Sequence, residues 1–173
     1  LASPLFAFSV SRKVYNAVRP LAIPWPNTGS NTFTNICTTT SINERKHLWL
    51  TAAHCVDEPE LNYFIDNKPA YIYDINNKLD QAILFVPALT VKGLRMQTYQ
   101  PKAGQPVRIV GHPQRLGDVQ VFSGHVASPS TLWPDSNLPF MMYDMTACRG
   151  NSGSAVISNK DEVIGVLTIG IGL

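Results

Sequence analysis

Two short segments carry residue types that together can perform nucleophilic catalysis. His54 follows the apolar stretch Leu48–Leu50 in the segment Thr-Ala-Ala-His-Cys, so an imidazole is expected just past a strand end, where a rigid scaffold can hold it. Ser152 lies between Gly150 and Gly153, immediately before another apolar run. A serine hydroxyl is a weak nucleophile. It needs a base within reach and backbone N–H groups directed at the carbonyl oxygen that becomes negative.

A carboxylate that could orient such a base stands at the entry of a third apolar segment. Asp80 precedes Ala82–Val86, and an acid entering a buried run costs free energy unless it has a partner, which a hydrogen-bonded imidazole would supply. Each segment also has a structural interpretation: a surface histidine, a plain glycine-containing hairpin turn, and a solvated strand-edge aspartate. If Asp80 is not the acid, Asp66 and Asp74 are the other candidates.

The elements that must position these residues are short strands. The 13 prolines and 11 glycines interrupt almost every window that could form a long helix. The sequence therefore predicts an all-β protein, a barrel or a sandwich, with the irregular stretch Pro87–Gln105 connecting two halves and an extended, irregular N-terminus of about thirty residues. The expected strands are Leu48–Ala53, Ala70–Ile75, Ala82–Val86, Val107–Val110, Val119–Ala127, Phe140–Met145, Ala155–Ser158 and Val163–Ile171.

The three segments occur in the order T-A-A-H-C, D-x-A-x-L and G-N-S-G, and in this order the chain from about Phe33 to Gly172 resembles the chymotrypsin-like serine peptidases. Tyr143–Met145 and Glu162–Gly165 are similar to the bacterial glutamyl-endopeptidase branch, and the high-temperature-requirement proteases share G-N-S-G. The resemblance implies two six-stranded antiparallel β-barrels with the active site in the cleft between them. Residues 1–90 would form the N-terminal barrel and residues 91–173 the C-terminal barrel.

The resemblance also implies the roles of the site residues. Ser152 would attack the scissile carbonyl of a protein or peptide, and His54 would take its proton and return it to the leaving amine. Asp80 would hold the imidazole tautomer, while the N–H groups of Gly150 and Ser152 would form the oxyanion hole. This acyl-enzyme chemistry needs no metal or cofactor. The competing hypothesis is a catalytically silent binding protein on the same fold.

The resemblance places the walls of the specificity pocket, and their composition predicts what they accept. The positions that hold a carboxylate in glutamyl endopeptidases match Ala147 and Leu167, and the position of the trypsin-type acid matches Thr146. Because burying an unpaired charge costs several kcal/mol, we expect cleavage after apolar or small uncharged residues, unless Arg149 or His125 reaches into the pocket. The expected walls are Thr146, Ala147 and Cys148 on one side and Leu167, Thr168, Ile169 and Gly170 on the other.

The three cysteines permit at most one internal disulfide, and no C-x-x-C spacing suggests a metal site. The resemblance implies a Cys37–Cys55 bond. Cys148 is then free, and we expect it to act as a small buried hydrophobe rather than as a redox-sensitive thiol. A disulfide indicates an oxidising compartment and hence an extracellular, secreted protein, although the N-terminus shows no signal-peptide pattern. The alternative is a viral protease domain released from a polyprotein.

Charge and hydropathy argue against two further classes of partner. The formal net charge is +2 and the basic residues are scattered, so the sequence predicts no nucleic-acid binding. No run of about 18 apolar residues is present, which predicts no membrane-spanning helix. The sequence leaves the oligomeric state open.

Overall fold

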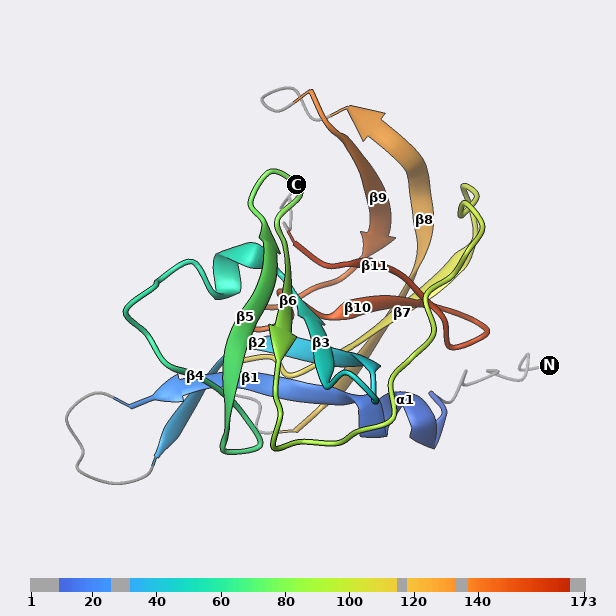
Figure 1. Ribbon diagram of the computed structural model, residues 1–173. Helices are drawn as coiled ribbons and strands as arrows, with labels where there is room; N and C mark the ends of the chain where they lie inside the picture. The colour runs from blue at the N-terminus through green and yellow to red at the C-terminus, as the bar shows by residue number, and fades with distance from the viewer. Residues whose placement is uncertain (1–9, 26–31, 115–117, 133–136, 169–173) are drawn as a thin grey trace.

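The first half of the molecule is a closed antiparallel barrel. The computed structural model describes residues 10–25, 32–114, 118–132 and 137–168 (Figure 1). Six strands close in the order β1-β2-β3-β6-β5-β4 because β1 pairs with both β2 and β4. Their bounds are β1 Val18–Pro24, β2 Phe33–Asn43, β3 Leu48–Thr51, β4 Tyr63–Ile65, β5 Lys68–Asn76 and β6 Gln81–Phe85.

The second half is an antiparallel sheet of five strands in the order β11-β10-β7-β8-β9. The two-lobed, all-β fold expected from the sequence is confirmed, but within the described residues this lobe is an open half-barrel and not the second six-stranded barrel. The physical reason is visible in the sequence, where only five strand-like runs follow Pro87, and β11 ends at Val166. The strands are β7 Pro106–Gly111, β8 Gln120–Leu132, β9 Pro139–Met145, β10 Ala155–Ser158 and β11 Val163–Val166.

All eight strands predicted from the sequence correspond to strands of the structure, but three further strands, β1, β2 and β4, were not predicted. β4 has only three residues, and β2 contains a run of threonines that weakens its apolar signal although all of Thr38–Ser41 is buried. The expectation of an irregular N-terminus is wrong for residues 12–24, which form a short helix, α1 (Arg12–Ala17), and β1. Pro20 is tolerated in β1, where it lies opposite Thr38, whose own N–H donates to Ser152 and not to β1.

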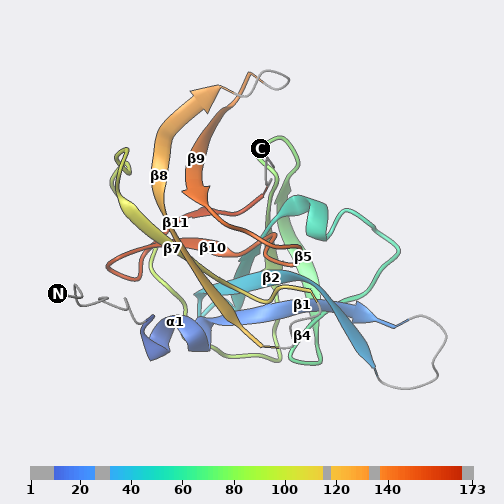
Figure 2. The same cartoon turned by 180° about the vertical axis from the view of Figure 1, so that it is seen from behind.

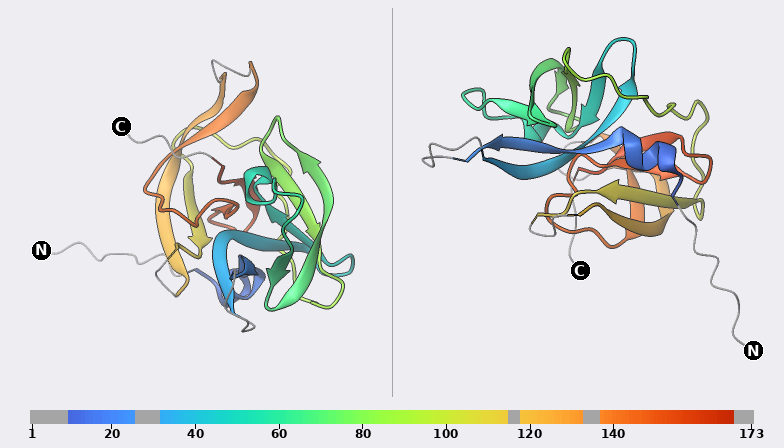
Figure 3. Two further views of the ribbon diagram at one scale, coloured as in Figure 1. Left: turned by 90° about the vertical axis from the view of Figure 1, so that its left-hand side faces the viewer. Right: turned by 90° about the horizontal axis from the view of Figure 1, so that it is seen from below.

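The N-terminal segment joins the two halves. Val14 and Ala17 of α1 are fully buried in a core that also contains Val110, Ala155 and Val163 of the second sheet. Seen from behind, α1 lies beside the strands of the second half (Figure 2). Figure 3 shows the two halves facing each other, the blue-to-green strands on one side and the yellow-to-red strands on the other. In the described part of the chain, no helix has the length and apolar character needed to span a membrane.

Candidate active site

The pairing of β3 with β6 brings the candidate base and acid together. Thr51 lies opposite Ala82 in this ladder, so the residues just after β3 and just before β6 share one end of the barrel. His54 sits there in a 3₁₀ turn, Ala53–Cys55, that follows β3. Asp80 is the residue before β6, and its carboxylate accepts two hydrogen bonds from the histidine, from Nδ1 at 2.7 Å and from the backbone N–H at 2.8 Å.

This double hydrogen bond fixes the imidazole and changes its basicity. The Asp80 hydrogen bond raises the pKa of His54 above 6.5, partial burial opposes this, and the charges of Asp80 and Asp57 add to the rise. Asp80 adopts φ 52°, an uncommon conformation for a residue with a side chain, and the two hydrogen bonds to His54 help to hold it. With Nδ1 occupied by the carboxylate, Nε2 is left to act as the base.

The other two candidate acids have different surroundings. Asp66 forms an ion pair with Arg19, whose Nε lies 2.7 Å from its carboxylate. The Asp74 carboxylate accepts a hydrogen bond from the backbone N–H of Ile75, the next residue. In the described part of the chain, Asp80 alone forms an ion pair with His54.

The candidate nucleophile sits in a turn that is hydrogen-bonded to the segment after β7 and to β2. The carbonyl of Arg149 accepts from the N–H of Gln114 at 2.7 Å, and that of Ser152 accepts from the N–H of Thr38 at 2.9 Å. The carbonyl of Gly150 accepts from the Thr38 hydroxyl at 2.9 Å. The turn is therefore tied to β2 of the barrel as well as to its own sheet.

These bonds also determine where the N–H groups of the turn can point. Asn151 N–H donates to Cys148, Gly153 N–H to Leu167 and Ser154 N–H to Asn151. Among the described residues, the N–H groups of Gly150 and Ser152 are the two in residues 150–154 that have no intramolecular acceptor. They are the two donors that the sequence assigned to an oxyanion hole, and both are free to bind a developing negative charge.

Two glycines allow the turn to lie this close to the barrel. Gly150 has φ 92° and Gly153 has φ 82°, values that favour glycine. A Cβ on Gly150 would meet the carbonyl oxygen of His112, 2.7 Å away, and the N–H of Gln114. A Cβ on Gly153 would meet the carbonyl of Thr38. The glycines that flank Ser152 are thus required by backbone geometry and by contact.

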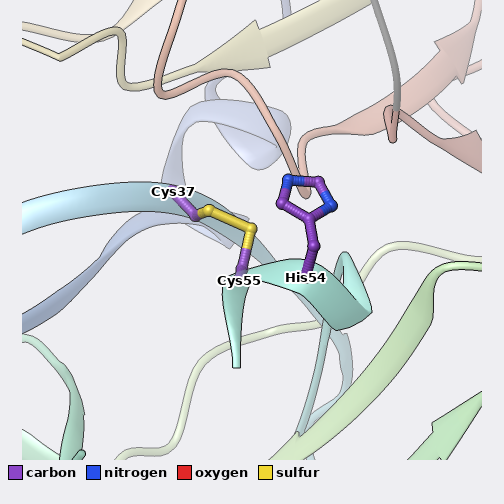
Figure 4. A group of neighbouring side chains, drawn as sticks. All are labelled: Cys37, His54 and Cys55. Carbon is purple, nitrogen blue, oxygen red and sulfur yellow. A yellow bond between two sulfur atoms is a disulfide. The ribbon is translucent and has the colours of Figure 1, made fainter. Parts of the chain in front are cut away.

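The predicted Cys37–Cys55 disulfide is confirmed and links β2 to the turn that carries His54 (Figure 4). Cys55 follows His54 directly, so the disulfide fixes the chain beside the imidazole. The two sulfurs and the imidazole lie within 4.8 Å of one another. Disulfide sulfurs are not thiolates, so this group does not constitute a metal-binding set.

A cavity of about 360 Å³ brings the candidate nucleophile and base to one surface. Gly150 and Ser152 line it together with His54, next to the disulfide. Its rim carries two acids, Asp57 and Glu58, and one base, Arg149. The apolar part of its lining comes from Ile23, Ile36, Leu61 and Tyr63.

A second cavity of about 360 Å³ lies beside the residues that flank Asp80. Its lining includes Leu167 and Thr168 of the predicted pocket walls and contains no charged side chain among the described residues. The other lining residues are Leu79, Gln81, Gln100, Pro129, Ser130, Pro139, Phe140, Met141, Tyr143, Ile164, Gly165 and Val166. The structure thus groups part of the predicted substrate wall with residues that the sequence did not single out.

The remaining predicted wall residues are not part of that lining. Thr146, Ala147 and Cys148 are exposed in the segment between β9 and the nucleophile turn, and Ile169 and Gly170 lie outside the described residues. Cys148 is a free thiol, as expected, but the expectation that it is buried is wrong. The segment leaves the sheet after Met145, so its side chains face solvent rather than a core.

Two residues that hold the site together were not predicted. Thr38 and Gln114 fix carbonyls of the nucleophile turn through hydrogen bonds between residues far apart in sequence. The threonines Thr38–Thr40 of β2 were the available signal for such hydrogen bonds, because hydroxyls that a strand buries usually have partners.

Comparisons with known proteins agree with this geometry. Residues 37–166 match the family model described as "Trypsin-like peptidase domain". The fold is similar to that in a solved structure described as "Crystal structure of the serine endoprotease from Yersinia pestis", with a TM-score of 0.71 and 21% sequence identity. That match covers 92% of this chain and 56% of the Yersinia pestis chain, so the present chain spans little more than half of its length. A search of curated proteins found no match.

Proposed function

The chain belongs to the trypsin-like peptidase family, and from this premise we propose that it is a serine endopeptidase with His54, Asp80 and Ser152 as its catalytic triad. Ser152 Oγ attacks the scissile carbonyl carbon while Nε2 of His54 takes the hydroxyl proton. The carbonyl oxygen becomes an oxyanion and accepts hydrogen bonds from the N–H groups of Gly150 and Ser152. Asp80 stabilises the imidazolium that forms.

Two steps then complete the cycle. The tetrahedral intermediate collapses, the C–N bond breaks, and the imidazolium of His54 gives its proton to the departing amine, leaving an ester on Ser152. Water attacks the acyl carbon while His54 takes its proton. The bond between that carbon and Ser152 Oγ then breaks, His54 returns the proton to Oγ, and the carboxylic acid product leaves. The raised pKa of His54 suits a group that must both accept and return a proton.

The observation that carries this proposal is the orientation of the nucleophile turn. Of its N–H groups, those of Gly150 and Ser152 have no acceptor within the described structure, while their neighbours are hydrogen-bonded. A binding protein on the same fold would have no need to keep two N–H donors of one turn without an acceptor near a histidine–carboxylate pair.

For specificity, we propose cleavage after apolar or small uncharged residues. The second cavity, with Leu167 and Thr168 in its wall, would receive the acyl side of the substrate. Because no charged side chain is present in its described lining, an acidic or basic substrate side chain would lose its hydration there without gaining a counter-charge.

A serine-directed fluorophosphonate probe tests the activity directly. We expect the folded protein to be labelled once, at Ser152, because the probe reacts only where base and oxyanion hole are assembled. Ser152→Ala and urea-unfolded protein are the controls and should not react. A folded protein that resists the probe and leaves a peptide library intact would instead be a silent binding protein.

The disulfide supports a location in an oxidising compartment, and we propose that the protein is extracellular. Mass mapping of protein isolated from its natural source without reductant should find Cys37 bonded to Cys55 and Cys148 free. Finding both cysteines of the pair as thiols would contradict the location.

A further inference from the structure

We propose that the buried hydroxyl of Thr38 is a positioning group that keeps the oxyanion hole open. Thr38 belongs to β2 of the barrel, is fully buried, and does not line either cavity. The inference rests on the proposed function, since it concerns how the N–H groups of Gly150 and Ser152 are held in place.

The main chain of Thr38 takes the place of a strand partner for the nucleophile turn. β2 pairs with β3 from Thr40 opposite Leu50, and β3 ends at Thr51. Beyond that end, the N–H of Thr38 donates to the carbonyl of Ser152 at 2.9 Å, and the carbonyl of Thr38 accepts from the Thr51 hydroxyl at 2.9 Å. The turn from the second half thus continues the first half's sheet.

The Thr38 side chain adds a second hydrogen bond to the turn, and its donor and acceptor can be assigned. The backbone N–H of His112 donates to Oγ1 at 2.9 Å, and Oγ1 lies 2.9 Å from the carbonyl oxygen of Gly150. A carbonyl oxygen can only accept, so the hydroxyl proton points at Gly150. The hydroxyl therefore links three segments: β2, the residue after β7, and the nucleophile turn.

This tie acts on the peptide group next to an oxyanion donor. Gly150 has φ 92° and no side chain, so the peptides on either side of it can rotate unless something fixes them. Gln114 fixes the preceding peptide through the Arg149 carbonyl, and Thr38 fixes the following one through the Gly150 carbonyl. Without the hydroxyl, the partly buried N–H of His112 and the buried carbonyl of Gly150 lose their partner. The Gly150 carbonyl belongs to the peptide between the two oxyanion donors, so its rotation would tilt the N–H groups of Gly150 and Ser152 away from the oxyanion.

The test compares Thr38→Val, which removes the hydroxyl at nearly constant volume, with Thr38→Ser, which keeps it. Thr40→Val is the matched control: Thr40 lies two residues along the same strand, is equally buried, and its hydroxyl has no partner among the described residues. For each variant we would measure kcat and KM on a peptide substrate and the second-order rate of fluorophosphonate labelling.

For Thr38→Val, we expect kcat and the labelling rate to fall about tenfold or more, with KM within about twofold, because a misaligned oxyanion hole weakens transition-state binding only. Thr38→Ser should stay within about threefold of wild type, and Thr40→Val should not change either rate. A purely structural role would lower the unfolding temperature of Thr38→Val but leave kcat of the folded enzyme unchanged.

The inference is overturned if folded Thr38→Val keeps the wild-type kcat and labelling rate, or if Thr38→Ser is as impaired as Thr38→Val. Should Thr38→Val fail to fold, Thr38→Ala takes its place, and its comparison with Thr38→Ser decides. Wild-type protein separates the two proposals. If wild type is not labelled, the proposed function fails; if wild type reacts and Thr38→Val reacts equally fast, this inference alone fails.

Discussion

The two halves of the molecule hold the proposed catalytic residues in different ways. In the closed barrel, His54 and Asp80 are brought together by one ladder, β3 with β6, and the hydrogen bonds between them lie within the barrel. In the open sheet, the turn that carries Ser152 depends on hydrogen bonds from Thr38 of the barrel as well as from Leu167 of its own half. The base–acid pair is thus a property of one barrel, whereas the nucleophile geometry is a property of the contact between halves.

The largest expected effect comes from removing a residue on either side of that contact. Ser152→Ala and His54→Ala should each lower kcat by about 10⁴-fold to 10⁶-fold, and combining them should cost little more, because the triad acts as a unit. Asp80→Asn should be nearly as damaging because the imidazole is then held in the wrong tautomer. Steady-state kinetics with circular dichroism as a folding control would measure this. A mild effect of Asp80→Asn would mean that another acid orients His54.

A smaller loss of kcat should follow from a substitution that crowds the contact between the halves and leaves the proposed triad unchanged. Gly150→Ala places a methyl group against the His112 carbonyl and the Gln114 N–H at φ 92°, so the turn must shift. Since a lost oxyanion donor costs about 10²-fold to 10³-fold in kcat, we expect a reduction of that order, with the pH dependence of kcat/KM the same as in wild type. Gly104→Ala is the matched control, because Gly104 also has a positive φ, 79°, but open space around it. Equal losses in both variants would point to backbone strain in general.

Removing the disulfide should affect the barrel's stability more than its chemistry. Cys37 and Cys55 close a loop of 18 residues, and in the chain-entropy model such a bond stabilises by about 3 kcal/mol. The double variant Cys37→Ala/Cys55→Ala should lose stability of that order in urea unfolding, with Cys148→Ser, at an exposed free thiol, as a control that changes little. Unchanged stability of the double variant would show that the bond contributes nothing to the fold.

The pH dependence of kcat/KM reports on the His54–Asp80 pair of the barrel. Since Asp80 raises the pKa of His54 above 6.5, kcat/KM should rise with pH through a titration above that value, as the imidazole becomes neutral. The charged pair stabilises the fold fully below the unfolded-state pKa of about 6.5, and this contribution is lost as pH rises through the higher folded-state pKa. Asp57→Asn should move the kinetic titration slightly down, because its charge adds to the rise. A flat profile between about pH 6 and 8 would exclude a histidine base.

The sequence predicted local features of the chain better than the contacts between its distant segments. The eight apolar runs became strands because side-chain alternation and burial are local signals. The catalytic candidates were found because residue type and glycine spacing are also local. The strand β1 with its prolines and the Thr38 hydrogen bonds were not predicted, since each depends on which distant segment the chain meets. The exposure of Cys148 was not predicted for the same reason.

The smallest expected effect comes from the different charges that line the two cavities. The one beside Leu167 has no charged side chain in its described lining, whereas the one beside the disulfide carries Asp57, Glu58 and Arg149. If the cavity beside Leu167 receives the acyl side of the substrate, the cavity beside the disulfide lies on the leaving-group side, where two acids against one base favour Lys or Arg after the cut.

The double variant Asp57→Asn/Glu58→Gln tests this difference. Because both acids are exposed, their attraction for a substrate cation is about 1 kcal/mol or less, so cleavage of peptides with Lys after the cut should fall only about twofold to fivefold. Peptides with Gln at the same position are the control and should be cleaved as before. Raising the ionic strength should remove the difference between wild type and variant, since salt screens exposed charges but leaves the apolar preference of the other cavity intact. A salt-insensitive change, or an equal change for Gln peptides, would mean that the acids act on the site's structure and not on the substrate's charge.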